Sequence, residues 1–97
     1  MQIKWNRLAV KRLMDAIQYL EDNENSAYAE KIEREILSKI KLLVERPKIH
    51  QLDRLKKNND GSFYAFEVDR YRISYREISR EIRILRIRHT SRRPFSR

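Results

Sequence analysis

The sequence predicts an α+β domain: an N-terminal strand and a two-helix hairpin precede a three-stranded antiparallel meander, and the helices pack on one face of the sheet. Three observations predict this class. Apolar residues recur every three or four positions between residues 8 and 44, and the period changes to two from residue 64 onward. The polar run Asn58–Gly61 separates the two patterns as a turn. With 97 residues we expect a single domain, 1–97.

The first half of the chain contains the helical hairpin. Residues 2–5 alternate and predict a short edge strand, after which Asn6 is a candidate N-cap. The first helix has its apolar positions at Val10, Leu13, Met14, Ile17 and Leu20. Ser26 is the expected cap of a second helix, and Pro47 is expected to end it. Its apolar stripe comprises Ala29, Ile32, Ile36, Ile40 and Leu43, widened by Leu37 and Val44.

The second half contains the strands. One face of the first two strands carries Tyr64, Phe66, Val68, Tyr71, Ile73 and Tyr75. This alternation predicts that the tyrosines lie in the core. The second strand places Arg72, Ser74 and Arg76 on the other face. The third strand, 81–88, mixes both parities, which predicts a central strand covered on both sides or a bulge. Residues 89–97 form a basic tail without periodicity.

Charge is concentrated at the C-terminal end. Residues 70–97 hold ten arginines and two acids, which is +8 of the formal net charge of +9. A guanidinium grips phosphate or carboxylate through two parallel hydrogen bonds, so we expect a surface for a polyanion or an acidic partner. The chain has no cysteine, no signal-like segment and no run of membrane-spanning length, which predicts a cytoplasmic protein. The two isolated histidines predict neither a metal site nor a cofactor.

Four segments, in order, resemble the RelE/ParE superfamily of toxins. They are the opening IKWNRLAVKRLMDAIQYLED, the helix end IKLLVERP (40–47), the strand YRISY (71–75) and the last strand IRILRIRH (82–89). The resemblance covers Ile3 to Pro94 and implies the toxin of a type II toxin–antitoxin pair, of the plasmid-stabilisation type. It also implies a cognate acidic antitoxin that neutralises the toxin and through which alone operator DNA is bound.

The superfamily contains two activities on one fold, so the site must decide between them. RelE-like members cut mRNA on the ribosome, whereas ParE-like members poison DNA gyrase without a catalytic set. For an RNase, the resemblance implies Arg72 on the scissile phosphate, with His89 and Arg92 as further candidates. The set is incomplete, because Glu67 stands where the family has lysine and Phe95 cannot exchange a proton.

We therefore prefer the ParE-like hypothesis, with the mRNA endonuclease as the alternative and a non-catalytic nucleic-acid-binding module as a second one. Structural interpretations stand beside the functional ones: Arg72 pairs with Glu67 across the hairpin, His89 caps the last strand, Trp5 packs in the core, and His50 has no assigned role. The residues expected to bind target or antitoxin are Arg72, Arg76, Arg83, Arg86, Arg88, Arg92 and Arg93.

Overall fold

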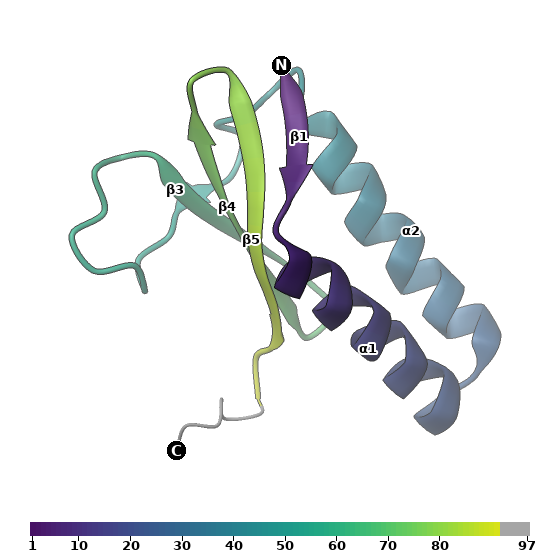
Figure 1. The fold of residues 1–97 in the computed structure, drawn as a ribbon. Coiled ribbons are helices and arrows are strands. Elements are labelled where there is room, and N and C mark those ends of the chain that lie inside the picture. Colours follow the sequence, from purple (N-terminus) through teal and green to yellow (C-terminus); the bar gives the residue numbers. More distant parts are fainter. Residues whose placement is uncertain (92–97) are drawn as a thin grey trace.

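The structure, a computed structural model, describes residues 1–91 of the chain. Its elements follow in the order β1 (Gln2–Trp5), α1 (Arg7–Asn23), α2 (Ser26–Leu42), β2 (Gln51–Leu52), β3 (Phe63–Val68), β4 (Tyr71–Ile78) and β5 (Glu81–His89) (Figure 1). The predicted α+β class is confirmed. The two-residue strand β2 is an addition, since its polar surroundings carry no strand pattern.

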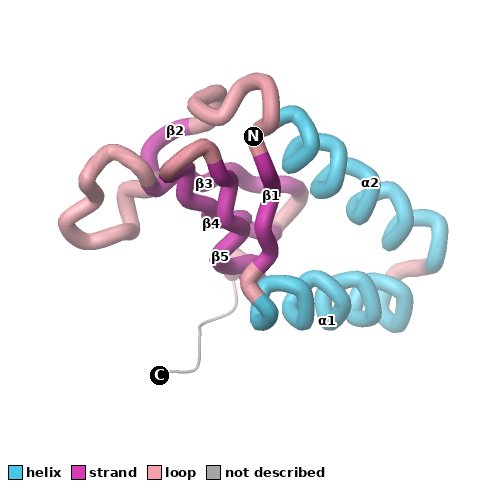
Figure 2. Tube along the Cα trace, turned by 45° about the horizontal axis from the view of Figure 1, so that its top comes forward, coloured by secondary structure: helices cyan, strands magenta, loops and turns pink. Residues whose placement is uncertain are grey.

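The strands form one sheet in the order β1-β5-β4-β3-β2. β1 is an edge strand, as predicted, and runs parallel to β5, whereas the other neighbouring strands are antiparallel. Both helices lie on one side of the sheet, and the long segment between β2 and β3 projects away from them (Figure 2). We call the face without helices the open face.

Asparagine side chains begin both helices. Asn6 Oδ1 accepts a hydrogen bond from the Leu8 N–H at 2.7 Å, which confirms the predicted cap. Asn25, not Ser26, caps α2, and its Oδ1 accepts from the Tyr28 N–H at 2.8 Å. The cap of α2 therefore lies one residue earlier in the chain than predicted. Within residues 1–91, neither helix is long and apolar enough to cross a membrane.

The apolar stripes of the helices are narrower than predicted. Their buried residues are Ala9, Ala16, Leu20, Ala29, Ile32, Ile36 and Ile40. Four predicted members of the stripes are exposed instead: Val10, Met14, Leu37 and Val44. A helix on a sheet buries only the stripe that faces the sheet, so residues further round the helix stay at its flank. α2 also ends at Leu42, before Pro47, so the proline does not itself end the helix.

Aromatic residues of the middle strands occupy the core, as predicted. Tyr71 and Tyr75 are almost fully buried, and the Tyr64 ring stacks on Tyr75 with 5.3 Å between centroids. The Tyr75 hydroxyl donates to the Pro47 carbonyl at 2.8 Å, which ties the segment after α2 to the sheet. Trp5 is partly buried against the same cluster.

β5 contains a bulge. Ser74 and Tyr75 are neighbours in β4, but their partners Arg86 and Ile84 are separated in β5 by Leu85. Leu85 is therefore an extra residue on β5. The bulge is confirmed as the explanation for the mixed pattern of this strand; β5 is also an interior strand of the sheet, but the helices cover only one of its faces (Figure 2).

The bulge changes which positions of β5 face the core. Ile82 and Ile84 are buried before it, and Ile87 is buried after it. Arg86 and Arg88 have the parity of Ile82, so a regular strand would turn both arginines into the core. The extra residue instead places them on the open face.

The turn between β4 and β5 generates a first prediction. Ser79 and Arg80 have φ values of 51° and 63°, which disfavour residues with a Cβ. We expect Ser79→Asn combined with Arg80→Gly to raise the free energy of unfolding by about 1 kcal/mol. Urea denaturation followed by circular dichroism measures it. Arg70→Gly is the control: Arg70 has no positive φ, so glycine there should not stabilise, and equal gains would refute the explanation.

Candidate functional site on the open face of the sheet

Arginines cross the open face in three rows set by the strand register. Arg88 lies beside Arg72 and Glu67, Arg86 lies beside Ser74 and Ala65, and Arg83 lies beside Arg76 and Phe63. Like charges directly opposite each other on neighbouring strands repel. The face therefore needs internal counter-charges or an anionic partner. Two more arginines expected in the site, Arg92 and Arg93, lie outside the described residues.

Arg72 is neutralised within the protein. Its guanidinium donates to Asp53 Oδ1 at 2.7 Å and lies 3.7 Å from Glu67 Oε2. The side chains of Arg72 and Asp53 are only 12% and 11% exposed. The cross-strand contact with Glu67 agrees with the structural interpretation of Arg72, whereas Asp53 had no predicted role. The Arg72 guanidinium is thus largely buried and already has an acidic partner within the protein.

The same contact fixes the segment between β2 and β3. Asp53 Oδ1 also accepts from the Leu55 N–H at 3.0 Å, and the Asn59 amide donates to the carbonyls of Asp53 and Phe63. The Gly61 N–H donates to Asn59 Oδ1 at 2.8 Å. These bonds hold the segment in one conformation beside the open face.

Arg76 is held by the end of this segment. It donates to Ser62 Oγ at 2.9 Å and to Asp60 Oδ2 at 3.3 Å, and its guanidinium stacks 4.5 Å from the Phe63 ring centroid. Hydrogen bonds from Ser62, and then the charge of Arg76, hold the pKa of the Asp60 carboxyl below its usual value. Arg83, beside Arg76 on β5, donates to Glu81 Oε1 at 3.0 Å. Three of the five arginines therefore have acidic partners.

Arg86 and Arg88 have no acidic partner within 4.0 Å among residues 1–91. Both line a cavity of about 250 Å³ on the open face, to which Lys56 and Lys57 of the opposite segment also contribute. These four residues bring to this cavity positive charge without an ion-pair partner among the residues that the structure describes. The sequence analysis did not select the two lysines, although they are adjacent in a basic segment.

His89 lies away from Arg72. Its ring contacts the edge of Tyr71 at 5.1 Å, and its Nδ1 accepts from the Ser91 N–H at 3.2 Å, consistent with a cap at the end of β5. Because residues alternate along the strand, His89 points to the same face as Ile87, opposite to that of Arg72. The described residues therefore do not assemble the RNase set, whose third member, Arg92, is outside them.

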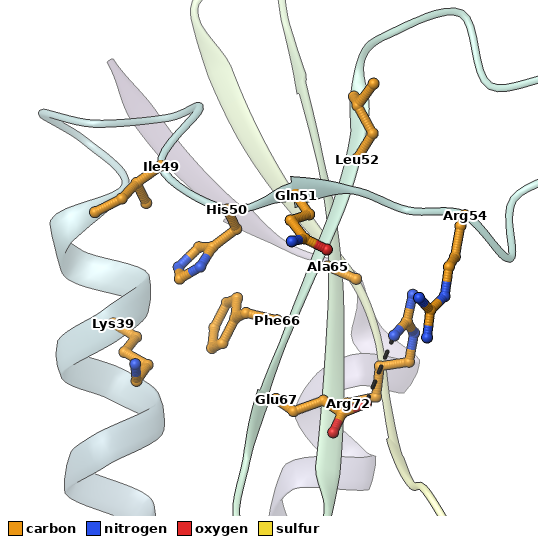
Figure 3. A pocket seen from close by; sticks show the side chains of 10 residues that line it. All are labelled: Lys39, Ile49, His50, Gln51, Leu52, Arg54, Ala65, Phe66, Glu67 and Arg72. Carbon is orange, nitrogen blue, oxygen red and sulfur yellow. Dashed lines mark ion pairs between the residues drawn. The ribbon is translucent and has the colours of Figure 1, made fainter.

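His50, which had no predicted role, lines a second cavity, of about 390 Å³ (Figure 3). Its ring stacks on Phe66 at 4.4 Å, and its Nε2 is buried without a hydrogen-bond partner within the described part of the chain. Burial, and then the charge of Lys39, lowers the His50 pKa from its usual value. Figure 3 shows the Arg54 and Arg72 guanidinium groups extending toward each other at the other end of this cavity. Among residues 1–91, no three His, Cys, Asp or Glu side chains gather to hold a metal ion.

Comparisons with known proteins place this geometry in context. The family model described as "ParE toxin of type II toxin-antitoxin system, parDE" matches residues 3–94. A toxin structure from the chromosomal ParDE system of P. aeruginosa matches with a TM-score of 0.71 and 21% identity, over 94% of this chain and 97% of that chain. The isolated E. coli RelE toxin matches with a TM-score of 0.57 and 14% identity, over 95% and 86%. No curated protein sequence matches the chain.

The buried ion pair generates a second prediction. We expect Asp53→Asn to lower the free energy of unfolding by about 3 kcal/mol, because it leaves the poorly hydrated Arg72 charge without its nearest partner. The matched control is Glu67→Gln, whose partner distance is longer and whose side chain is 53% exposed, so the loss should stay below about 0.5 kcal/mol. Denaturant unfolding measures both. Equal losses would contradict the assignment of Asp53 as the anchor.

His50 generates a third prediction, on pH. Its folded-state pKa is lowered, so the unfolded chain takes up the proton first as the pH falls. The stabilising contribution is complete above the unfolded value of 6.5 and is lost as the pH falls through the folded value. We expect His50→Phe to keep the aromatic stack and to flatten this loss between about pH 7 and pH 5. Unfolding free energies at several pH values measure it, and identical slopes for both proteins would refute it.

Proposed function

The chain belongs to the ParE toxin family of type II toxin–antitoxin systems, and we propose that it inhibits growth by poisoning DNA gyrase and not by cutting mRNA. A family of this type implies a cognate antitoxin as partner. The fold alone does not decide the target, because toxins of both kinds share it, although the match to the toxin of the ParDE system (TM-score 0.71) is closer than the match to RelE (TM-score 0.57).

The observation that carries the proposal is the ion pair between Arg72 and Asp53 at 2.7 Å. An RNase would use this arginine to stabilise charge that develops on the phosphate. Here the guanidinium is already occupied by one buried carboxylate and approached by Glu67. Bringing a phosphate to it would place three anionic groups around one cation, and this favours a mode of action without phosphate chemistry.

The second support is the separation of the candidate acid–base group from the arginine. A general acid or base must reach the reacting atoms within hydrogen-bond distance, directly or through one water. His89 points toward the helix-covered side, and Arg72 points to the open face. Proton transfer by His89 at a phosphate bound to Arg72 is therefore disfavoured by the pleat of the sheet.

The contact surface that we propose is the four-cation cluster, defined as Lys56, Lys57, Arg86 and Arg88. It borders a cavity whose lining also includes Leu55, Phe63, Ser74 and Leu85. Unneutralised cations around a partly apolar lining suit a protein partner with acidic groups at its contact site. An acidic antitoxin that covered this surface would also block it.

The RelE-like alternative has one observation in its favour, since Arg72 does lie on the open face in the strand that carries the resemblance. The two mechanisms separate in time after induction. We expect expression of the chain without antitoxin to stop thymidine incorporation within minutes while methionine incorporation continues. Early loss of methionine incorporation would overturn the gyrase proposal, and no effect on either would overturn growth inhibition altogether.

Variants make the fourth prediction specific. We expect Arg86→Glu combined with Arg88→Glu to weaken inhibition of purified gyrase at least tenfold, equivalent to about 1.4 kcal/mol of binding free energy. The paired change Arg72→Met with Asp53→Leu removes the buried ion pair together and should retain inhibition. Arg34→Glu with Arg46→Glu makes the same charge change on and just after α2 and serves as the control. Loss of gyrase inhibition only in the Arg72 pair would contradict the four-cation cluster as the contact surface, and no inhibition of gyrase by the unaltered chain would favour the RNase alternative.

A further inference from the structure

Only the first half of β5 has a strand on its outer side. β1 pairs with Glu81 to Ile84, the Asn6 N–H donates to the Ile84 carbonyl at 3.0 Å, and the chain then enters α1. Within residues 1–91, no strand pairs with this side of β5 beyond Leu85. A strand edge of this kind presents its backbone N–H and C=O groups to another extended segment.

The direction of these backbone groups follows from the pairing with β4. The Thr90 N–H donates to the Arg70 carbonyl at 2.7 Å, so the backbone of Thr90 points toward β4. Backbone direction alternates along an antiparallel strand, and Arg88 and Arg86 therefore also point toward β4. Ile87, between them, points its N–H and C=O to the outer edge.

A groove of about 580 Å³ runs along this edge, beside the first turns of α1 (Figure 1 shows α1 starting next to β5). Its lining combines apolar and cationic side chains: Leu8, Leu85 and Ile87 with Arg12, Arg86 and Arg88. Leu8 is 53% exposed, so its side chain is accessible to a partner in the groove. The groove thus offers backbone hydrogen bonds, apolar area and positive charge together.

We propose that the outer edge of β5 from Leu85 to Arg88 accepts an added β-strand from an acidic partner protein. The pleat dictates the pattern of that strand. Alternate side chains would lie beside Ile87 and Leu8 and be apolar, and those between them would lie beside Arg86 and Arg88 and be acidic. An added strand gains affinity from main-chain hydrogen bonds and specificity from these alternate contacts.

Charge decides between this occupant and two others. The last six residues of the chain contain Arg92, Arg93 and Arg97, no acid, and Pro94, which lacks a backbone donor. A second copy would bring its own net charge of +9. An acidic partner alone complements the arginines. The antitoxin implied by the family would be its natural source, and the inference rests on the proposed function only for that identification.

The test uses a defined probe, the acetylated and amidated pentapeptide Glu-Val-Glu-Ile-Glu, with the full chain. We expect saturable binding by isothermal titration calorimetry and slower hydrogen exchange of the Ile87 amide. Two analogues, N-methylated either at the apolar or at the acidic residues, test strand pairing. Only the analogue whose methyl groups face β5 should bind at least tenfold more weakly, because only those amides donate to the edge. Equal affinity of both analogues would overturn the proposal.

Variants of the protein complete the test. Arg86→Glu with Arg88→Glu should weaken binding of the peptide at least tenfold, whereas Arg34→Glu with Arg46→Glu should leave it unchanged. A gain in affinity on deleting residues 92–97 would assign the edge to the chain's own end instead. Dimerisation in sedimentation experiments with protection of the Ile87 amide, without peptide, would assign it to a second copy. None of these readouts involves gyrase, so failure here is distinct from failure of the proposed function.

Discussion

The bulge at Leu85 determines where the positive charge of this protein lies. Arg86 and Arg88 follow Ile82 and Ile84 at the spacing of one strand face, and burying two unpaired guanidinium groups would cost far more than a domain of this size has in net stability. One extra residue in β5 moves both arginines to the open face and keeps Ile87 in the core. The bulge also falls at the point where β1 stops pairing with β5. The bulge thus places both arginines on the open face, at the point where the outer edge of β5 becomes unpaired.

The remaining arginines show how the fold tolerates so much like charge. Arg72, Arg76 and Arg83 each contact an acid, and two of these acids come from the segment between β2 and β3. That segment is held by Asn59 and Asp53 as well as by the ion pairs, so neutralisation and loop conformation depend on each other. The cations left over on β5 and at Lys56 and Lys57 then form a compact surface and not a uniformly charged sheet.

Local patterns in the sequence were sufficient for the helices, the strands of the meander, the edge strand and the irregularity in β5. Each of these depends on residues close together in the chain, whose periodicity and caps can be read directly. The contacts that define the site are different in kind. Asp53 meets Arg72 across 19 positions, and His50 meets Phe66 only because β2 pairs with β3. No periodicity marks an aspartate or a histidine in a polar connection, so these partners follow from the fold and not from the pattern. The predicted width of the helical stripes was wrong for the same reason, because the buried width depends on how much of each helix the sheet covers.

The loop between β2 and β3 shows how two proteins of the same fold can differ in the ligands that the same arginine can bind. Strand β4 presents Arg72 on the open face whatever surrounds it, since its register with β3 and β5 is set by the core tyrosines and isoleucines on its other side. What the arginine can do depends on the acids that reach it. A carboxylate from outside the meander, Asp53, binds the guanidinium at 2.7 Å and converts a possible phosphate ligand into a structural anchor. Because a largely buried charge cannot lose its partner without a large stability loss, a catalytic role at this position would require changing the loop and the strand together. The loop between β2 and β3, through Asp53, therefore determines how far the Arg72 guanidinium is available to a ligand.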